Sequence, residues 1–314
     1  IVFPIDSLCI KTLEMNEIPD YLTHGEPVYI DLKIVGIITA AELEDNRKQE
    51  LNRLRQNDED RLSIFYSDVN NVITNDFLYS NNIMYKAFFG IGTWDKNKLY
   101  NILDAFNGIN PDDISDNYFS INYGGKYFDE NSAKLIGHIR NVIEDIKSTL
   151  TEKEYCILLA SLIYSIDKIA NTLGHFEAYI KKEIKPKKFI MRLVDAQCVS
   201  GVKIYQEDAN TLARNIHTDV LYMDPPYNSR QYSRFYHVYE VLVKWDKPQL
   251  SGTARKPKPE HMSDYCRVKA LDTFVDLIAH ADCKYIVVSY NNTYKSKSSS
   301  SQNKNKVRAN KGSP

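Results

Sequence analysis

The sequence predicts an α/β protein with a mostly parallel sheet and a helical insertion. Short apolar, β-branched runs alternate with helix-like stretches in the C-terminal part of the chain, a pattern typical of parallel strands buried on both faces. Residues 77–188 show no clear series of strands. A hydrophobic content of 43% and a charged content of 26% over 314 residues are globular values.

In the first half of the chain the pattern predicts mainly helices. Residues 40–56 are charged with sparse apolar positions and predict an exposed helix, whereas residues 70–76 predict a strand. Residues 129–150 are amphipathic near a 3.6-residue period, and Thr151 with Glu154 forms a capping box that opens a second helix. We expect both of these helices to lie in the core.

After a break at residues 185–187, the pattern changes to apolar runs that predict strands over residues 189–194, 202–205, 220–223 and 285–289. Helix-like stretches cover residues 232–245 and 264–280. The roughly 110 residues between the strand at 70–76 and the next predicted strand exceed what a simple crossover needs. This excess predicts an inserted helical domain.

Acidic residues follow three of the predicted strands. Asp76, Asp208 and Asp224 each stand just past a carboxyl end, the edge at which open α/β sheets bind ligands. Each alone is also compatible with a helix N-cap, a common use of Asp. Three such residues at three strand ends favour ligand binding.

The most informative motif is Asp224-Pro225-Pro226-Tyr227. It suits methyl transfer to an amino nitrogen of a nucleobase, whose lone pair is delocalised into the ring. The Asp224 carboxylate and the Pro225 carbonyl can accept hydrogen bonds from that amino group, and the two prolines fix the direction of the carbonyl. Tyr227 offers an aromatic face for a flipped base. A plain turn is the alternative, but the aromatic, basic and amide-rich flank of residues 228–237 favours a functional site.

Residues 224–237, DPPYNSRQYSRFYH, resemble the catalytic motif and following segment of the Dam-like N6-adenine DNA methyltransferases, in the branch that accompanies type II and type IIS restriction enzymes. Further stretches resemble that branch at residues 72–76, 122–128, 171–176, 205–209 and 284–291. The resemblance covers roughly residues 65–305. It implies the Rossmann-like fold of S-adenosylmethionine-dependent methyltransferases.

The resemblance also implies roles for individual residues. Asp224, Pro225, Pro226 and Tyr227 would be catalytic, and S-adenosylmethionine would be bound by Asp76 at its ribose, by Asp208 at its adenine, and by Tyr222. Contacts to double-stranded DNA would come from Asn228, Arg230, Tyr232, Tyr236 and Asn292. No metal is implied. A cognate restriction endonuclease is the expected functional partner.

One feature departs from this family. Its members carry a Phe-x-Gly-x-Gly loop just before the strand that corresponds to residues 72–75, where the backbone approaches the methionine part of the cofactor. Residues 59–70 contain no glycine, and Phe89-Gly90-Ile91-Gly92 comes after Asp76. We therefore expect that the chain binds S-adenosylmethionine weakly or not at all. An RNA amino-methyltransferase and a catalytically defective relic remain alternatives to the DNA enzyme, and the first residue, Ile1, favours a fragment.

The composition also limits which other classes of protein the chain can belong to. The absence of a run of 18 apolar residues or of a secretion signal predicts no membrane span and a cytoplasmic location. The five scattered cysteines predict reduced thiols and no structural zinc. The formal net charge is −1, yet residues 244–314 hold 14 Lys and Arg against 6 Asp and Glu, which suits phosphate contacts.

These patterns predict four parts. Residues 1–62 are a divergent N-terminal segment, and residues 63–94 with 186–294 are the methyltransferase domain. Residues 95–185 are the helical insertion, which would either read the target sequence or only pack on the domain without contacting DNA. Residues 295–314 are a mobile basic tail.

Overall fold

The computed structural model describes residues 72–197, 201–226 and 229–289, together with the backbone of residues 7–10, 12–14 and 36–39. The chain divides into two compact units. Unit 1 comprises residues 1–69, 209–229 and 263–314, and unit 2 comprises residues 70–208 and 230–262. The helix predicted at 40–56 and the tail at 295–314 lie outside the described residues. The functional domain boundaries stay predictions.

Unit 1 contains a three-stranded sheet in the order β2-β7-β6, formed by Thr12–Glu14, Asp282–Val288 and His217–Met223. β6 and β7 are parallel, with Met223 opposite Val288, whereas β2 is antiparallel to β7. A separate antiparallel pair consists of β1 (Ser7–Ile10) and β3 (Gly36–Thr39). The strands predicted at 220–223 and 285–289 are therefore confirmed, and each begins three residues earlier than expected.

Helices of unit 1 pack their apolar residues on β6 and β7. α11 (Ala270–His280) contacts α8 (Ala209–Ala213) and the short 3-10 helix η5 (Asp264–Cys266). Leu277 and Ile278 of α11 are buried with Met223 and Ile286 of the two strands. The helix predicted over residues 264–280 is confirmed in two pieces, because residues 267–269 interrupt it.

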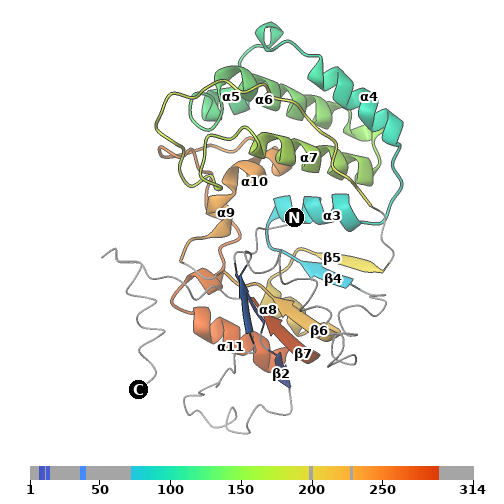
Figure 1. Cartoon of the computed structure of the whole chain (residues 1–314), viewed down its shortest axis with the longest axis vertical. Helices are drawn as coiled ribbons and strands as arrows, with labels where there is room; N and C mark the ends of the chain where they lie inside the picture. Colours follow the sequence, from blue (N-terminus) through green and yellow to red (C-terminus); the bar gives the residue numbers. More distant parts are fainter. Residues whose placement is uncertain are drawn as a thin grey trace. The chain divides into compact units, whose positions relative to one another are not determined.

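Unit 2 contains a pair of parallel strands, β4 (Val72–Asn75) and β5 (Val202–Tyr205). α3 (Tyr79–Phe89) lies between this pair and α7 (Glu152–Asp167), as Figure 1 shows. The remaining helices are α4 (Lys96–Asn107), η3 (Pro111–Asp113), α5 (Tyr118–Tyr123), α6 (Glu130–Asp145), η4 (Lys147–Thr149), α9 (Tyr232–Phe235) and α10 (His237–Lys244). The helical stretch predicted from residue 232 is thus confirmed, with a break at Tyr236.

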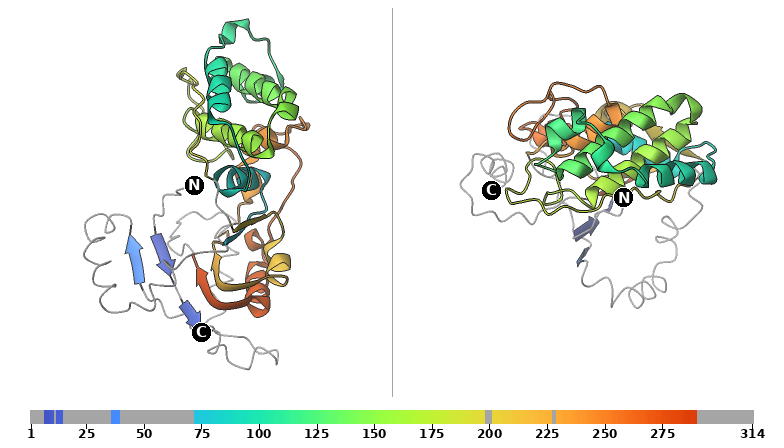
Figure 2. Two further views of the ribbon diagram at one scale, coloured as in Figure 1. Left: turned by 90° about the vertical axis from the view of Figure 1, so that its right-hand side faces the viewer. Right: turned by 90° about the horizontal axis from the view of Figure 1, so that it is seen from above.

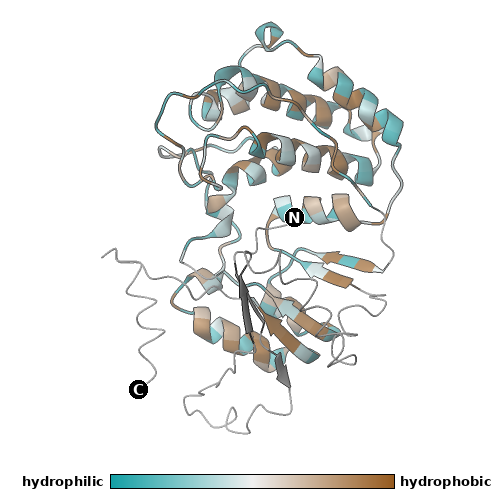
Figure 3. Cartoon of the chain, viewed as in Figure 1, coloured by the Kyte–Doolittle hydropathy of each residue, from teal (hydrophilic) through white to brown (hydrophobic). Residues whose placement is uncertain are grey.

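The core of unit 2 surrounds α7. Every residue from 156 to 163 of this helix is buried, which is typical of a helix inside a domain, and brown, hydrophobic stretches are visible on it in Figure 3. Ile157, Leu158 and Leu162 are fully buried there, and Ile136 and Ile143 of α6 join the same cluster. The green helices α6 and α7 lie side by side in both views of Figure 2. The two helices predicted to be core helices are therefore confirmed.

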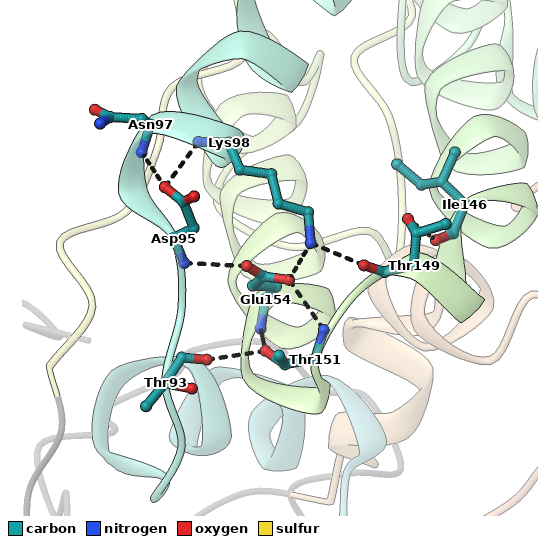
Figure 4. A network of polar contacts seen from close by, with 8 residues as sticks. All are labelled: Thr93, Asp95, Asn97, Lys98, Ile146, Thr149, Thr151 and Glu154. Carbon is teal, nitrogen blue, oxygen red and sulfur yellow. Dashed lines mark hydrogen bonds and ion pairs between the residues drawn. The ribbon is translucent and has the colours of Figure 1, made fainter.

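The predicted capping box of α7 extends into a larger network, drawn in Figure 4. Glu154 accepts hydrogen bonds from the backbone N–H of Thr151 at 2.9 Å and of Asp95 at 3.0 Å, and from Lys98 Nζ at 2.6 Å. The Thr151 hydroxyl donates to the Thr93 carbonyl oxygen at 2.9 Å. Burial would raise the pKa of Glu154, but these hydrogen bonds outweigh it and lower the pKa. One carboxylate therefore fixes the starts of both α7 and α4.

The strand predicted at residues 189–194 is wrong, because helix side chains replace a neighbouring strand as hydrogen-bond partners. Asn107 of α4 accepts from Met191 N at 2.8 Å and donates to Met191 O at 3.0 Å. Ser165 and Ser161 of α7 accept from the backbone N–H groups of Arg192 and Val194, each at 3.0 Å. The apolar side chains of this segment pack against the helical core instead of a sheet.

In the described residues the parallel strands form two small sheets, β4-β5 in unit 2 and β6-β7 in unit 1. The α/β class predicted from the sequence is confirmed at this level. Among the described helices, none combines the length and hydrophobicity that crossing a bilayer requires.

Candidate functional site

The DPPY motif begins where β6 ends. The backbone N–H of Ser289, just after β7, donates to the Met223 carbonyl oxygen at 2.8 Å, so the parallel pairing continues up to Asp224. Asp224 and Tyr222 are exposed, whereas Pro225 and Pro226 are half-buried. The surrounding chain removes part of the hydration of the Asp224 carboxyl group and raises its pKa. A more basic carboxylate is a stronger hydrogen-bond acceptor, which suits the role predicted for Asp224.

Three predicted site residues have no described structure. Tyr227 and Asn228 of the motif region, and Asn292 after β7, lie outside the described residues. The segment at 59–70, where the glycine loop of the family would fall, lies outside them as well.

Asp76 follows β4 and is held by the start of α3. Its carboxylate accepts a hydrogen bond from Leu78 N at 2.8 Å and another from Asn81 Nδ2 at 2.7 Å. Burial raises the pKa of Asp76, and these two hydrogen bonds oppose the rise. Both carboxylate oxygens keep a free lone pair after one such bond each. Asp76 can therefore support the helix and still accept hydrogen bonds from a ligand.

Asn75 joins the ends of β4 and β5. Its side chain donates to the Glu207 carbonyl oxygen at 3.0 Å and accepts from Glu207 N at 2.9 Å. Because the two strands are parallel, with Asn75 opposite Tyr205, this exchange fixes the loop that carries Asp208. Asp76 and the exposed Asp208, both predicted to bind the cofactor, therefore lie past the carboxyl ends of neighbouring strands in one sheet.

Sequence reasoning missed Glu240, a buried carboxylate on α10. It accepts from the backbone N–H groups of Tyr79 at 3.1 Å and Ser80 at 2.8 Å, two groups that the first turn of α3 leaves without helical partners. Burial raises the pKa of Glu240, and the hydrogen bonds from these two residues oppose the rise. The sequence feature that could have identified Glu240 is its position as the single acidic residue in the largely apolar run of residues 237–243. Asn81, the partner of Asp76, gave no such signal.

Aromatic rings cover the residue that follows Asp76. The ring of His261 stacks on Phe77, with centroids 4.5 Å apart, and also lies 4.8 Å from the ring of Tyr79. His261 has a backbone φ of 48°, in the left-handed region. No pattern in the sequence predicts that His261 lies beside the residue that follows Asp76.

The flank of the motif, residues 230–237, forms an aromatic row on α9 and α10. The ring of Tyr232 stacks with Phe235 at 6.0 Å, and Tyr236 stacks with Tyr239 at 6.0 Å. Arg230 is ion-paired with Glu177 at 2.5 Å. The three described residues predicted to contact DNA thus belong to one segment of unit 2, and Tyr232 and Tyr236 are half-buried in it.

Two further stretches singled out in the sequence pack against this flank. The backbone N–H of Phe176 donates to the Phe235 carbonyl oxygen at 2.8 Å, and the hydroxyl of Tyr127 donates to the Phe176 carbonyl oxygen at 2.8 Å. His175 stacks on Phe235 with centroids 4.6 Å apart. Residues 122–128 and 171–176 therefore support the segment that follows the DPPY motif.

The glycines at 90 and 92 have a structural use. Gly90 ends α3, and its N–H donates to the Tyr85 and Lys86 carbonyl oxygens. A Cβ atom at Gly90 would lie 2.5 Å from the Lys86 carbonyl oxygen, and Gly92 has a φ of 145°. These constraints require glycine at both positions.

Comparisons with known proteins identify relatives over most of the chain. The family profile described as D12 class N6 adenine-specific DNA methyltransferase matches residues 62–305. The chain is 32% identical over 238 residues to the type II methyltransferase M.NlaIII of Neisseria lactamica, a match that covers 73% of this chain and 70% of that protein. It is 34% identical over 238 residues to the type II methyltransferase M.FokI of Planomicrobium okeanokoites, covering 70% of this chain and 37% of that protein.

A viral relative matches as well. The type II methyltransferase M.CviAII of Paramecium bursaria Chlorella virus 1 is 31% identical over 203 residues, covering 62% of this chain and 61% of that protein. No solved structure matches the chain significantly.

Proposed function

This chain belongs to the D12 class N6 adenine-specific DNA methyltransferases, and we propose that it transfers the methyl group of S-adenosylmethionine to N6 of adenine within a specific sequence of double-stranded DNA. The observation that carries the proposal is the family match over residues 62–305, which includes Asp224 at the carboxyl end of β6. Loss of methyl transfer in an Asp224 variant is the corresponding test.

Methyl transfer requires mainly that the protein positions the base and polarises its amino group. The Asp224 carboxylate and the Pro225 carbonyl accept hydrogen bonds from the amino group, which returns electron density to its nitrogen. Pro225 and Pro226 fix the direction of the carbonyl. Tyr227 supplies the face on which the flipped adenine stacks, and this stacking offsets part of the cost of leaving the duplex.

The cofactor supplies an electrophilic methyl group when it is bound. The residues past β4 and β5 suit its adenosine half, because carboxylates accept hydrogen bonds from hydroxyl and amino groups. Asp76 would accept from the ribose and Asp208 from the adenine, with Tyr222 as a further contact. The fit is supported by the lone pairs that Asp76 keeps beside Leu78 and Asn81. We also propose that the chain adopts the Rossmann-like fold of methyltransferases that use this cofactor.

Two further features of the proposal come from the relatives. M.NlaIII and M.FokI are named type II methyltransferases, and on this likeness the chain would act together with a cognate restriction endonuclease. Contacts from Asn228, Arg230, Tyr232, Tyr236 and Asn292 would hold the DNA. Modification of chromosomal DNA would place the enzyme in the cytoplasm.

Asp224→Ala should abolish methyl transfer and leave the fold intact. Loss of one preorganised acceptor costs about 10²–10³ in rate. Incorporation of tritiated methyl groups into duplex DNA of mixed sequence measures the effect, with circular dichroism as the check on folding. A folded variant that keeps more than about a tenth of the wild-type rate would exclude the role of Asp224, since that exceeds the remainder expected after losing such an acceptor.

A further inference from the structure

Three cationic side chains form a cluster in unit 2, within and next to the segment that follows the DPPY motif. It consists of Arg230 and Arg234 from that segment, and Lys256 from the loop after α10. Arg230 Nη1 lies 2.5 Å from Glu177 Oε1, and Lys256 Nζ lies 3.7 Å from the same oxygen. Arg234 Nη1 donates to the Pro257 carbonyl oxygen at 2.5 Å, next to Lys256.

Well-packed backbone holds this cluster in place. The Tyr127 hydroxyl contacts the carbonyl oxygens of Phe176 at 2.8 Å and Ala254 at 3.1 Å, which ties the chain on both sides of the cluster to one point. The ring of His237 lies 3.0 Å from the Ala254 carbonyl oxygen. The backbone N–H of Phe176 in turn donates a hydrogen bond to the Phe235 carbonyl oxygen. The cations are thus carried by a fixed surface.

The carboxylate of Glu177 faces more than one of these positive charges. Among the described residues, Glu177 is the one acidic side chain that contacts Lys256 or influences the charge of Arg234. The Lys256 side chain is only 15% exposed. Burial lowers the pKa of Lys256, and the positive charges of Arg234 and Arg230 lower it further against the effect of Glu177. Burial also lowers the pKa of Arg234.

Such a cluster would be stabilised by another anion, because partly desolvated cations are costly until they are paired. A phosphate diester fits the residue types. Arginine presents a planar set of donors that matches phosphate oxygens, and lysine adds a compact charge. Chain connectivity keeps Arg230 within a few residues of the DPPY motif.

We propose that Arg230, Arg234 and Lys256 bind a backbone phosphate of the DNA, and that Glu177 is a positioning residue that orients Arg230 and Lys256. The proposal rests on DNA being the substrate. A phosphate contact fixes the position of the duplex without reading its sequence. The site should therefore contribute to affinity for every DNA sequence alike. Glu177 partly neutralises the cations, so it also weakens the phosphate contact.

Opposite effects of two substitutions test this site. Lys256→Gln should weaken binding of a fluorescent duplex of mixed sequence by about fivefold at ~0.1 M salt, and should reduce the salt slope of the logarithm of the binding constant by about 0.9. Glu177→Gln should strengthen binding by a similar factor, because it removes the competing charge. Fluorescence anisotropy of the full chain over a salt series measures both, without cofactor and without catalysis.

Matched variants separate a binding role from a structural one. Lys256→Arg keeps the charge and should keep the salt slope. Lys284→Gln removes a charge from the Lys284–Asp219 pair on β6 and β7, and should leave the salt slope unchanged. An unchanged slope in Lys256→Gln would overturn the proposal. Weaker binding in both Lys256→Gln and Glu177→Gln would also overturn it, because the cluster would then only support the fold.

The experiments distinguish failure of the phosphate site from failure of the proposed enzymatic function. If the wild-type chain transfers no methyl group to DNA while the two substitutions still shift affinity in opposite directions, the phosphate site stands and the enzymatic proposal does not. If methyl transfer is intact and the substitutions leave affinity unchanged, the reverse holds.

Discussion

The Asp76 carboxylate has one observed use and one predicted use. It supports the start of α3 through Leu78 and Asn81, and it lies past the carboxyl end of β4, where we propose that it contacts the ribose of the cofactor. The sequence predicted the position of Asp76 from the strand pattern alone. It did not predict Asn81 as a partner, because a side-chain contact across one helical turn leaves no periodic trace.

Asp76→Asn separates the two uses. The amide oxygen can still accept from Leu78 N, so the helix start should survive, but the charge and one acceptor oxygen are lost. Binding of S-adenosylmethionine should weaken by about 1.5–3 kcal/mol, the value of a hydrogen bond to a charged group. Isothermal titration calorimetry measures it, with the midpoint of thermal unfolding as the control. Unchanged affinity would show that Asp76 only supports α3.

His237 is a fully buried ring between two carbonyl oxygens, those of Arg234 at 3.2 Å and Ala254 at 3.0 Å. Burial lowers its pKa from 6.5 to about 4, and the hydrogen bonds to the two carbonyl groups only partly oppose this. The folded state therefore keeps His237 neutral at a pH where the unfolded chain already binds a proton.

The pH dependence of stability follows from this difference. His237 contributes its full stabilisation above pH 6.5, and the contribution is lost as the pH falls from 6.5 through the folded pKa of about 4. The total is on the order of 3 kcal/mol, from a pKa difference of roughly two units or more. Urea unfolding over this range should show a shallower pH dependence in His237→Gln. Parallel curves for the two proteins would contradict the assignment.

At the scale of elements, α3 is fixed at both ends by residues from other helices. Glu240 of α10 binds its first N–H groups. At the other end, Lys153 of α7 donates to the carbonyl oxygens of Lys86 at 3.0 Å, Gly90 at 2.8 Å and Gln197 at 2.6 Å. Because the first turn of α3 also holds Asp76, these contacts help to position this predicted cofactor residue.

Lys153→Met should destabilise unit 2 by about 3 kcal/mol, because it leaves one buried and two partly buried carbonyl groups without a charged donor. Lys86→Met is the matched control. Lys86 joins the same two helices through Glu152 at 2.9 Å, but both side chains are exposed, so its loss should cost less than about 1 kcal/mol. Urea unfolding compares the two variants. Equal losses would mean that burial of the Lys153 ammonium group has no special value.

The elements that the sequence predicted well were those with a local signal. The capping box at Thr151 and Glu154 and the apolar run before Asp224 each determine their structure within a few residues. Residues 189–194 were misassigned because their apolar, β-branched pattern is equally consistent with a strand and with an extended segment on helices. Asn107, Ser161 and Ser165 decide between the two, and they are distant in sequence.

At the scale of the whole molecule, the family match covers residues 62–305, and the chain aligns with 70% of M.NlaIII but with 37% of M.FokI. The resemblance stated from DPPYNSRQYSRFYH agrees with this family. The cluster of Glu177 with Arg230 and Lys256 had no local signal, because its members come from segments far apart in the sequence. A motif can therefore be recognised from the sequence, while its supporting residues require the fold.

The most direct test of the proposed function is to identify the nucleoside that the wild-type chain methylates. Purified protein is incubated with S-adenosylmethionine and either duplex DNA of mixed sequence or ribosomal RNA, and the digested nucleosides are identified by mass spectrometry. We expect N6-methyladenine in the DNA, no methylated nucleoside in the RNA, and loss of the DNA product in Asp224→Ala. Methylation of RNA alone, or N6-methyladenine formed at the wild-type rate by Asp224→Ala, would contradict it.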